Sequence, residues 1–385
     1  MIRSTVARVD LGALRRNFRA IREFLGSGAA AGALATGHPP SIVAVVKANA
    51  YGHGAEAVAL ALEAEGARLL ACADIEEGIV LRRAGVRAPI LVFGALSVSD
   101  LDGLFEFSLT PTISTPSAAR AVEAAAARRG VTTGYHLKID TGMNRLGFRH
   151  DNLRRTLPEL LASPHLRLDA VYTHFASADD PERTLFTDQR EHFEAATRVV
   201  AELGAPGVPR HASNSAALLR DSRVWYDMVR PGLLLYGIVP PPMASTLPLE
   251  PVMSLTSRVV AVKGLRPGEG VGYGWRFTAA EPRTIAVVPA GYADGLDTRL
   301  SGRGAVLVRG VRAPIVGAVS MDMITVDVSD VPDVTPGDEV VLLGRQGPES
   351  WQQIDAREMA ASIGTIPWEV VCRLGTRVER QYATS

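Results

Sequence analysis

Several features that would mark a specialised class of protein are scarce in this sequence. Among its 385 residues, cysteine occurs only as Cys72 and Cys372, which is too few for a disulfide scaffold, and no Cys/His spacing suggests zinc. The 41 basic and 41 acidic residues cancel, so neither nucleic acid nor an anionic membrane is an expected partner. No apolar run is long enough for a membrane span, and Met1–Thr5 lacks the apolar run of a signal peptide. We therefore expect a soluble cytoplasmic protein without a metal site.

The first part of the chain alternates between strand and helix patterns. Helical patterns such as Ile75–Ala84, Pro116–Arg129 and Asp188–Leu203 separate short β-branched or apolar segments. The eight candidate strands are Ile42–Val46, Leu69–Ala73, Ile90–Phe93, Leu109–Ile113, Tyr135–Ile139, Leu168–Thr173, Pro209–His211 and Tyr226–Val229. Eight strand–helix units of this combined length predict a (β/α)8 barrel.

The character of the sequence changes after Gly237. Prolines cluster at 240–242 and within 246–251, as in a linker. The short β-rich segments that follow are Ser254–Lys263, Thr284–Pro289, Gly304–Val308, Ile315–Val319 and Ile324–Val328. They predict a mostly antiparallel C-terminal domain, with one late helix near Asp355–Ile363.

The N-terminal strand pattern, Val6–Val9, is followed by a helix pattern rather than by a barrel strand. Asp10 is placed to cap that helix, which we expect over Leu11–Leu25. The first strand is therefore expected to pair into the second domain, and Gly26–Pro40 to form a surface loop without an assigned function. The expected domains are a barrel over residues 11–238 and a β-rich domain formed by residues 1–10 and 239–385.

The apolar run Ser41–Val46 reads as a buried parallel strand that delivers Lys47 at its carboxyl end. A lysine flanked by apolar residues at the mouth of a sheet loses its charge readily and can attack a carbonyl. An isolated lysine at this place would more simply snorkel from the barrel rim. The residues that follow, Ala48–Gly54, and the motifs at the other strand ends decide between these interpretations.

Polar motifs also follow four other candidate strands, where the chemistry of such barrels is carried out. They are Lys138 with Asp140–Gly147, Tyr172–Ala176, His211–Ser215 and Arg230–Gly232. Ser213-Asn214-Ser215 opens a helix, and Gly232 lets the backbone approach a ligand closely; both arrangements suit a phosphate. The alternative is that Asn214 and Ser215 only cap their helix.

Three motifs in combination resemble the alanine racemases, which are pyridoxal-phosphate (PLP) enzymes of fold type III. They are the decapeptide Val45–Gly54, D-T-G-M-x-R-L-G at Asp140–Gly147, and G-Y-A-D-G at Gly291–Gly295. The resemblance covers nearly the whole chain, from Val9 to Val370. It implies PLP held by Lys47 and interconversion of L- and D-alanine, which would supply D-alanine for a bacterial cell wall.

The resemblance also implies roles for residues around the cofactor. Arg230 would contact the pyridine nitrogen, His211 would orient Arg230, and His174 would lie against the ring, although each histidine alone could equally be an interior residue. Because arginine does not give up its proton, the ring nitrogen would stay unprotonated and a weaker electron sink, which disfavours transamination and decarboxylation. The further implied cofactor-binding residues are Tyr51, Asn214, Ser215, Gly232, Leu233 and Trp368.

Racemisation needs bases on opposite faces of a planar intermediate. Lys47 would serve one face, and Tyr273 matches the family's catalytic tyrosine for the other, since tyrosine holds a proton yet can release it to a carbanion. By resemblance, Tyr273, Tyr292 and Met321 would complete the site of the partner in a head-to-tail homodimer. Arg145 would bind the substrate carboxylate with its planar fork, and Lys138 matches a lysine that carries a carbamate in many relatives.

The sequence departs from the family at three positions: Trp368 and Ser320 replace a common tyrosine and cysteine, and Gly272 replaces a serine. A decarboxylase is a competing interpretation, but those enzymes have an acidic partner for the ring nitrogen. A racemase of serine or broad specificity is another. A non-catalytic PLP-binding homeostasis protein would lack the second domain, and a barrel enzyme without PLP would leave Lys47 unexplained.

Overall fold

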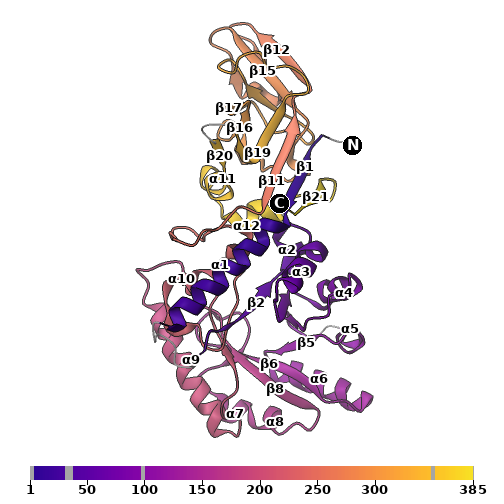
Figure 1. Cartoon of the computed structure of the whole chain (residues 1–385), viewed down its shortest axis with the longest axis vertical. Coiled ribbons are helices and arrows are strands. Elements are labelled where there is room, and N and C mark those ends of the chain that lie inside the picture. Colours follow the sequence, from indigo (N-terminus) through magenta and orange to yellow (C-terminus); the bar gives the residue numbers. More distant parts are fainter. Residues whose placement is uncertain (1–3, 31–37, 97–99, 348–351, 385) are drawn as a thin grey trace.

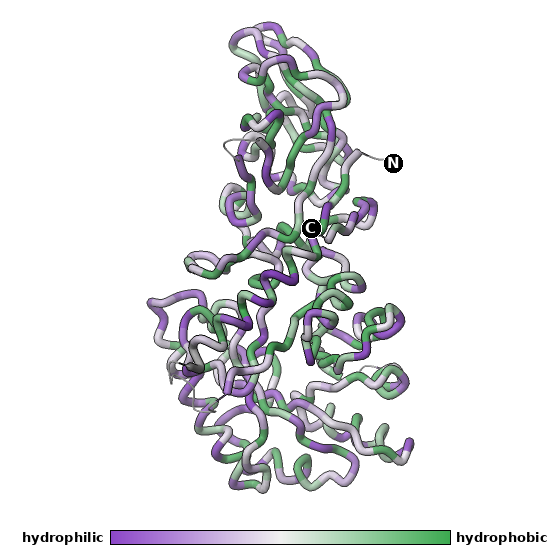
Figure 2. The backbone as a smooth tube through the Cα atoms, viewed as in Figure 1, coloured by the Kyte–Doolittle hydropathy of each residue, from purple (hydrophilic) through white to green (hydrophobic). Residues whose placement is uncertain are grey.

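The computed structural model describes residues 4–30, 38–96, 100–347 and 352–384. A barrel and a β-rich domain follow one another along the long axis of the molecule, and both chain ends lie near the β-rich domain (Figure 1). Hydrophobic and hydrophilic residues are interleaved along the backbone of both bodies (Figure 2). Within the described ranges, no helix has the length and apolar character needed to cross a membrane.

Eight parallel strands close the barrel, which confirms the predicted fold class. Their order is β5-β4-β3-β2-β10-β9-β8-β6, and the pairing of β6 with β5 joins the ends. The strands are β2 (Ser41–Val45), β3 (Leu69–Cys72), β4 (Ile90–Val92), β5 (Thr110–Ile113), β6 (Thr133–Asp140), β8 (Leu166–Tyr172), β9 (Arg210–His211) and β10 (Met228–Val229). Each overlaps a predicted strand, because a buried parallel strand needs a β-branched or apolar run.

Helices cover the barrel and begin where the sequence offers a side-chain cap. Asp74 accepts from the Glu77 amide and Thr115 from the Ala118 amide, each satisfying a helix N–H that has no partner within the helix. The helices of the barrel are α1 (Leu11–Ala30), α2 (Lys47–Tyr51), α3 (Ala55–Ala64), α4 (Ile75–Arg83), α5 (Asp102–Glu106), α6 (Pro116–Arg129), α7 (Leu153–Thr156), α8 (Pro158–Leu161), α9 (Leu185–Glu202) and α10 (Ser215–Arg220). A short strand β7 (Phe148–Arg149) pairs with β6, and 3-10 turns lie at η1 (Ser222–Val224) and η2 (Leu233–Tyr236).

The second domain is built on one large sheet, in the order β12-β15-β18-β17-β16-β19-β11-β1-β21. Its strands are β1 (Val6–Asp10), β11 (Met253–Arg258), β12 (Ala261–Leu265), β15 (Arg283–Val288), β16 (Ala305–Val308), β17 (Val311–Val316), β18 (Ile324–Asp327), β19 (Glu339–Gln346), β20 (Gln352–Ile354) and β21 (Glu379–Ala383). A separate hairpin consists of β13 (Gly270–Val271) and β14 (Phe277–Thr278). The remaining turns and helices are η3 (Tyr273–Trp275), η4 (Tyr292–Asp294), η5 (Thr298–Leu300), α11 (Ala356–Ile363) and α12 (Pro367–Cys372).

The N-terminal strand does enter the second domain, as the sequence predicts. β1 lies between β11, which runs antiparallel to it, and β21, which runs parallel. Ala7 and Val9 are fully buried there. The strand β1 therefore completes a sheet whose other strands begin at Met253.

Two predictions of local structure need correction. The single strand expected over Ser254–Lys263 is two strands, because Val259 is buried and bonds to Asp338 while the adjacent Val260 is 46% exposed. A continuous β-branched run concealed that break. The loop expected over Gly26–Pro40 begins later, because α1 continues to Ala30 through Gly26-Ser27-Gly28-Ala29-Ala30, although the two glycines disfavour a helix; positions 31–37 lie outside the described residues.

Candidate active site

Lys47 lies at the end of β2 and begins a turn with unusual backbone geometry. Ala48, Asn49 and Ala50 have φ between 52° and 53° and ψ between 47° and 53°, and Tyr51 has φ 53°. These are left-handed helical conformations, which cost a residue with a Cβ about 1–2 kcal/mol each. The segment contains two glycines, but the strained residues precede Gly52 and Gly54. Surrounding contacts must therefore hold the turn that presents Lys47.

Four cationic side chains gather around this mouth. Lys47 is accessible to solvent, but the surrounding protein removes part of its hydration, which lowers its pKa. The charges of Arg145 and Arg230 lower that pKa further. Lys138 on β6 is only 6% exposed, and burial together with Arg145 and Arg230 lowers its pKa to about 8. Its Nζ lies 5.5 Å from the centre of the Tyr172 ring. Amines in this cluster lose their protons more readily than amines in water, which favours Lys47 as a nucleophile.

Arg230, just after β10, is buried and held by the ends of β8 and β9. Its Nη1 donates to Nδ1 of His211 at 2.9 Å, and its Nη2 donates to the carbonyls of Thr173 and Ala212 at 2.8 and 2.9 Å. Nη2 is also 3.3 Å from Nδ1 of His174. No ion pair joins Arg230 to a carboxylate anywhere in the described chain. Burial lowers the pKa of Arg230 to about 10, so it remains a fixed cation at neutral pH.

The donor character of Arg230 sets the tautomers of the histidines behind it. Because His211 accepts at Nδ1, its proton is on Nε2, which lies 2.9 Å from Nδ1 of His136. Burial, reinforced by the charge on Arg230, places the pKa of His211 well below its ordinary value, and that of His136 falls to about 4. Both histidines are therefore neutral near pH 7. They orient Arg230 without adding charge.

A second corner of the mouth joins the loops after β9 and β10. Asn214 caps α10 by accepting from the Ala217 amide at 2.9 Å, so the capping role considered from the sequence is present. Ser215 Oγ accepts from the Gly232 amide at 3.0 Å, leaving its hydroxyl proton to donate to an anion. A Cβ at Gly232 would stand 2.3 Å from the hydroxyl of Tyr51, so only glycine fits. Leu233 follows, fully buried in η2.

The loop that carries Arg145 is shaped by Asp140. One oxygen of this carboxylate accepts from the amides of Gly142 and Asn144, each at 3.0 Å. A Cβ at Gly147 would lie 2.5 Å from the Asp140 nitrogen, which explains the glycine that ends the motif. The loop leaves Arg145 exposed, where its charge acts on Lys47 and Lys138.

Three other predicted site residues, Tyr273, Tyr292 and Met321, lie on the surface of the second domain. Their side chains are 78%, 45% and 52% exposed. The Tyr292 amide donates to Ser320 next to Met321, and Gly317 packs against Val271 beside the Tyr273 turn, so the three segments adjoin one another. Such exposed aromatic and methionine side chains are typical of a surface that meets a partner.

The helix that carries Trp368, α12, packs on the Lys47 turn. A Cβ at Gly52 would lie 2.1 Å from the carbonyl oxygen of Val371, so the two backbones touch. Trp368 itself is partly buried against the core. This places α12 against the same turn as Tyr51.

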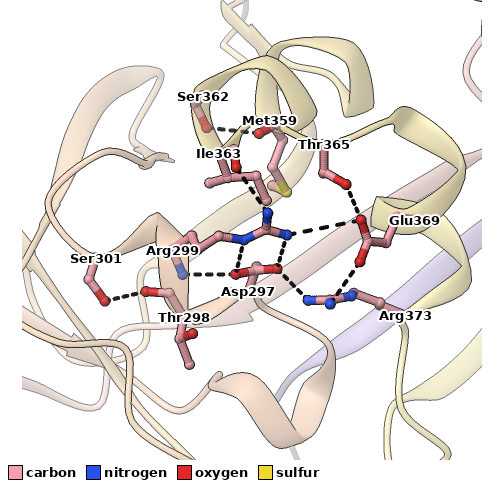
Figure 3. Close-up of polar contacts among 10 residues, drawn as sticks. All are labelled: Asp297, Thr298, Arg299, Ser301, Met359, Ser362, Ile363, Thr365, Glu369 and Arg373. Carbon is pink, nitrogen blue, oxygen red and sulfur yellow. Dashed lines mark hydrogen bonds and ion pairs between the residues drawn. The ribbon is translucent and has the colours of Figure 1, made fainter.

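A network of two carboxylates and two guanidinium groups fixes α12 to the η5 turn within the second domain (Figure 3). Asp297 pairs with Arg299 at 2.8 Å and also with Arg373, and Arg373 pairs with Glu369 at 2.8 Å. The hydrogen bonds from Arg299 lower the pKa of Asp297 to about 2.

Asp297→Asn should therefore lower the free energy of unfolding at neutral pH. The ordinary pKa of an aspartate in an unfolded chain is about 3.9, so the stabilisation is present above about pH 4 and is lost as the pH falls toward 2. Denaturant unfolding across that range should show the difference between wild type and variant shrinking with acidification. Asp330→Asn, an exposed control in the same domain, should change little at any pH; a constant difference for Asp297→Asn would contradict the assigned charge.

Sequence reasoning missed Glu77, His136 and Gln189. Glu77 accepts from the Ala48 amide at 2.7 Å, and Gln189 bonds to the backbone of His174 at 3.0 Å. His136 and Gln189 lie inside a strand and a helix, where their patterns do not stand out. Glu77 had a signal: it follows a barrel strand within a D-x-x-E pattern, but that pattern is usually a helix start.

The comparisons with known proteins cover almost all of the chain. Residues 9–240 match the family model "Alanine racemase, N-terminal domain" and residues 252–382 match "Alanine racemase, C-terminal domain". The alanine racemase of Halothermothrix orenii is 39% identical, over 99% of this chain and 97% of its own, and that of Sorangium cellulosum is 42% identical, over 99% of each. A crystal structure of alanine racemase from Streptomyces lavendulae, which produces D-cycloserine, superposes with a TM-score of 0.91 at 33% identity, covering 100% of this chain and 98% of that one.

Proposed function

The chain belongs to the alanine racemase family, and from that premise we propose that it racemises alanine with PLP by a two-base mechanism and supplies D-alanine for peptidoglycan. The observation that carries the mechanism is the buried Arg230. It ends a barrel strand, has a neutral histidine behind it and is paired with no carboxylate in the described residues. A permanent cation at this place suits an unprotonated ring nitrogen, which restricts the chemistry to removal and return of the Cα proton.

The residues at the mouth fit PLP. Ser215, Gly232, Tyr51 and Leu233 form a small corner with free donor capacity, suited to a phosphate. Asn214 caps the helix that begins at Ser215, and Trp368 lies on α12, which packs on the turn that carries Tyr51. Lys47 supplies the amine that holds the cofactor, and His174 lies beside Arg230. PLP, when bound, withdraws electrons from Cα of the amino acid and so makes the Cα proton removable.

Two bases then act from opposite sides of the substrate. Lys47 takes or returns the proton on one side, because its surroundings favour the neutral amine. Tyr273 of a second copy of the chain acts on the other, and Tyr292 and Met321 of that copy border the substrate. Arg145 binds the substrate carboxylate with Lys138 beside it; carbamylation of Lys138 stays a prediction.

The test of this function is L-alanine in heavy water with protein and PLP, followed by optical rotation and by deuterium at Cα. We expect optical activity to decay to zero while deuterium enters. A yellow protein that leaves L-alanine unchanged would contradict alanine as the substrate, and L-serine in the same assay would then test a wider specificity. A colourless protein would exclude PLP.

Activity should depend on the head-to-tail dimer. Tyr273 is exposed in its own chain, so a monomer would lack one base. Dilution below the dimer dissociation constant, followed by ultracentrifugation and rate measurement, should show turnover disappearing with the dimer. Full activity in a proven monomer would contradict this arrangement.

Mixing two inactive variants gives a sharper version of the same test. A dimer of one Lys47→Ala subunit and one Tyr273→Phe subunit has one intact site, made from Lys47 of one chain and Tyr273 of the other. Random re-pairing makes half of the dimers mixed, each with half of its sites intact, so about a quarter of wild-type activity should return. No recovery in demonstrably mixed dimers would contradict sharing of the site.

A further inference from the structure

The first amides of the left-handed turn after Lys47, like those at the start of any helix, have no partner within the turn and need one elsewhere. Within the turn, the Ala50 amide donates to Val46 at 2.8 Å and the Gly52 amide to Ala48 at 3.0 Å. The Ala48 amide, directly after Lys47, instead donates to Oε1 of Glu77 at 2.7 Å. The orientation of the peptide that carries Lys47 therefore depends on a side chain from another element.

Glu77 joins two strand ends with one carboxylate. Its second oxygen, Oε2, accepts from the amide of Ala73, which follows β3, at 2.8 Å. Glu77 is itself fixed in the first turn of α4, because its amide donates to Asp74 Oδ1 at 2.9 Å. The carboxylate thus ties the Lys47 turn to the end of the neighbouring strand.

The local sequence predicts a helix-capping role for Glu77. Asp74-Ile75-Glu76-Glu77 has the spacing of a capping box, in which the glutamate binds the amide of the capping residue itself. Here both oxygens bind amides outside the helix, those of Ala48 and Ala73. Helix capping alone does not account for this arrangement.

Glu77 also brings a negative charge close to Lys47, among side chains that are mostly cationic. The charges of Arg145 and Arg230 lower the pKa of Lys47, and the charge of Glu77 raises it. Asp140 does the same for Lys138. Removing the Glu77 charge would leave Lys47 facing guanidinium groups.

We propose that Glu77 is a positioning residue for the cofactor-binding lysine, holding the left-handed turn that presents Lys47 and partly offsetting the positive charge around it. This inference rests on the proposed function for its consequence in turnover. Its structural part concerns the chain alone and is measured without the cofactor.

The test compares Glu77→Gln and Glu77→Asp with wild type in the full-length chain. Glutamine keeps the size of the side chain but loses the charge and one of the two acceptors. Aspartate keeps the charge but is too short to reach both amides. The matched control is Glu76→Gln, an equal charge change at the exposed neighbour on the same helix.

The first measurement is the reactivity of Lys47 toward an amine-modifying reagent as a function of pH, by peptide mass spectrometry of the cofactor-free chain. The chain has three lysines, and the exposed Lys263 in β12 is an internal reference. Glu77→Gln should lower the apparent pKa of Lys47, Glu77→Asp should largely restore it, and Glu76→Gln should leave it unchanged. An unchanged Lys47 in Glu77→Gln would overturn the charge role.

The second measurement is steady-state racemisation after PLP is added. Glu77→Gln should lower kcat by on the order of tenfold or more, because a reacting group displaced by a fraction of an ångström loses its alignment. KM for alanine should change less, since Arg145 is untouched, and Glu77→Asp should recover kcat only in part. Equal kcat in Glu77→Gln and Glu76→Gln would overturn the positioning role.

These outcomes separate this inference from the proposed function. Wild-type protein that does not racemise alanine would contradict the function, while the Lys47 titration would still decide the role of Glu77. If Glu77→Gln does not fold, the same two measurements on Glu77→Asp decide it: full kcat with only one amide bond possible would overturn the proposal.

Discussion

Lys47→Ala should abolish racemisation of both enantiomers and leave the protein unable to hold PLP covalently. In the proposed mechanism Lys47 both binds the cofactor and acts as one of the two bases, and an alanine side chain can do neither. Neither of the other lysines is equivalent, because Lys138 is buried beside Tyr172 and Lys263 lies in the second domain. The loss should therefore be complete within the sensitivity of the assay.

Borohydride reduction followed by intact-protein mass measurement checks the covalent part of this prediction. Wild type should gain the mass of the reduced cofactor, and Lys47→Ala should not. Lys263→Ala is the control and should behave as wild type, since its side chain is exposed on β12. Cofactor attached to the Lys47→Ala chain would reassign the binding lysine, with Lys138 the next candidate.

Tyr273→Phe should separate the two faces of the reaction. The substitution keeps the ring and removes the hydroxyl, so one face loses its acid and base while Lys47 still serves the other. Exchange of the Cα proton with solvent should persist for the enantiomer that Lys47 deprotonates and slow by roughly a hundredfold or more for the other. Net racemisation should slow equally in both directions, because the two enantiomers are equal in free energy.

Deuterium incorporation into each recovered enantiomer, measured at early times, distinguishes this result from a general loss of activity. Trp275→Phe is the control that disturbs the same turn and leaves the Tyr273 hydroxyl in place, since Trp275 is 66% exposed and packs on Gly270 in the same hairpin. It should not slow exchange selectively for one enantiomer. Equal small losses on both enantiomers in Tyr273→Phe would remove this tyrosine from the mechanism.

The barrel could be predicted from sequence because its strands combine burial on both faces with a regular spacing, as at Ile42–Val46 and Ile90–Phe93. The second domain was harder. The strands β19 and β21 were not predicted, and the break at Val259 occurs between two valines that look alike in sequence. Val259 is buried and Val260 is exposed because of the strands that pair with β11 and β12. The order of residue types in the sequence does not show which strands will pair.

The candidate site divides in the same way. Lys47, Arg145 and Arg230 could be proposed because each follows a strand, and the barrel gathers strand ends at one mouth. Arg230 and His211 are 19 positions apart in the sequence, and His211 and His136 are 75 apart. Their hydrogen bonds therefore could not be predicted from sequence spacing. The left-handed turn was not predicted because alanine and tyrosine rarely adopt positive φ, and one asparagine, Asn49, is too weak a sign of four consecutive such residues. Contacts made in the fold, among them those with Glu77, Gly232 and α12, hold it.

The position of β1 has a consequence for how the chain is made. During synthesis β1 leaves the ribosome well before its partners β11 and β21, which begin only at Met253 and Glu379. At about 5–20 residues per second, the strand waits roughly 12 to 50 seconds for β11. The barrel can assemble on the ribosome in that interval, while its own N-terminal extension stays unpaired. The β-rich domain thus closes around a strand translated before the barrel, and release of the chain before β11 is made would leave β1 without its partners.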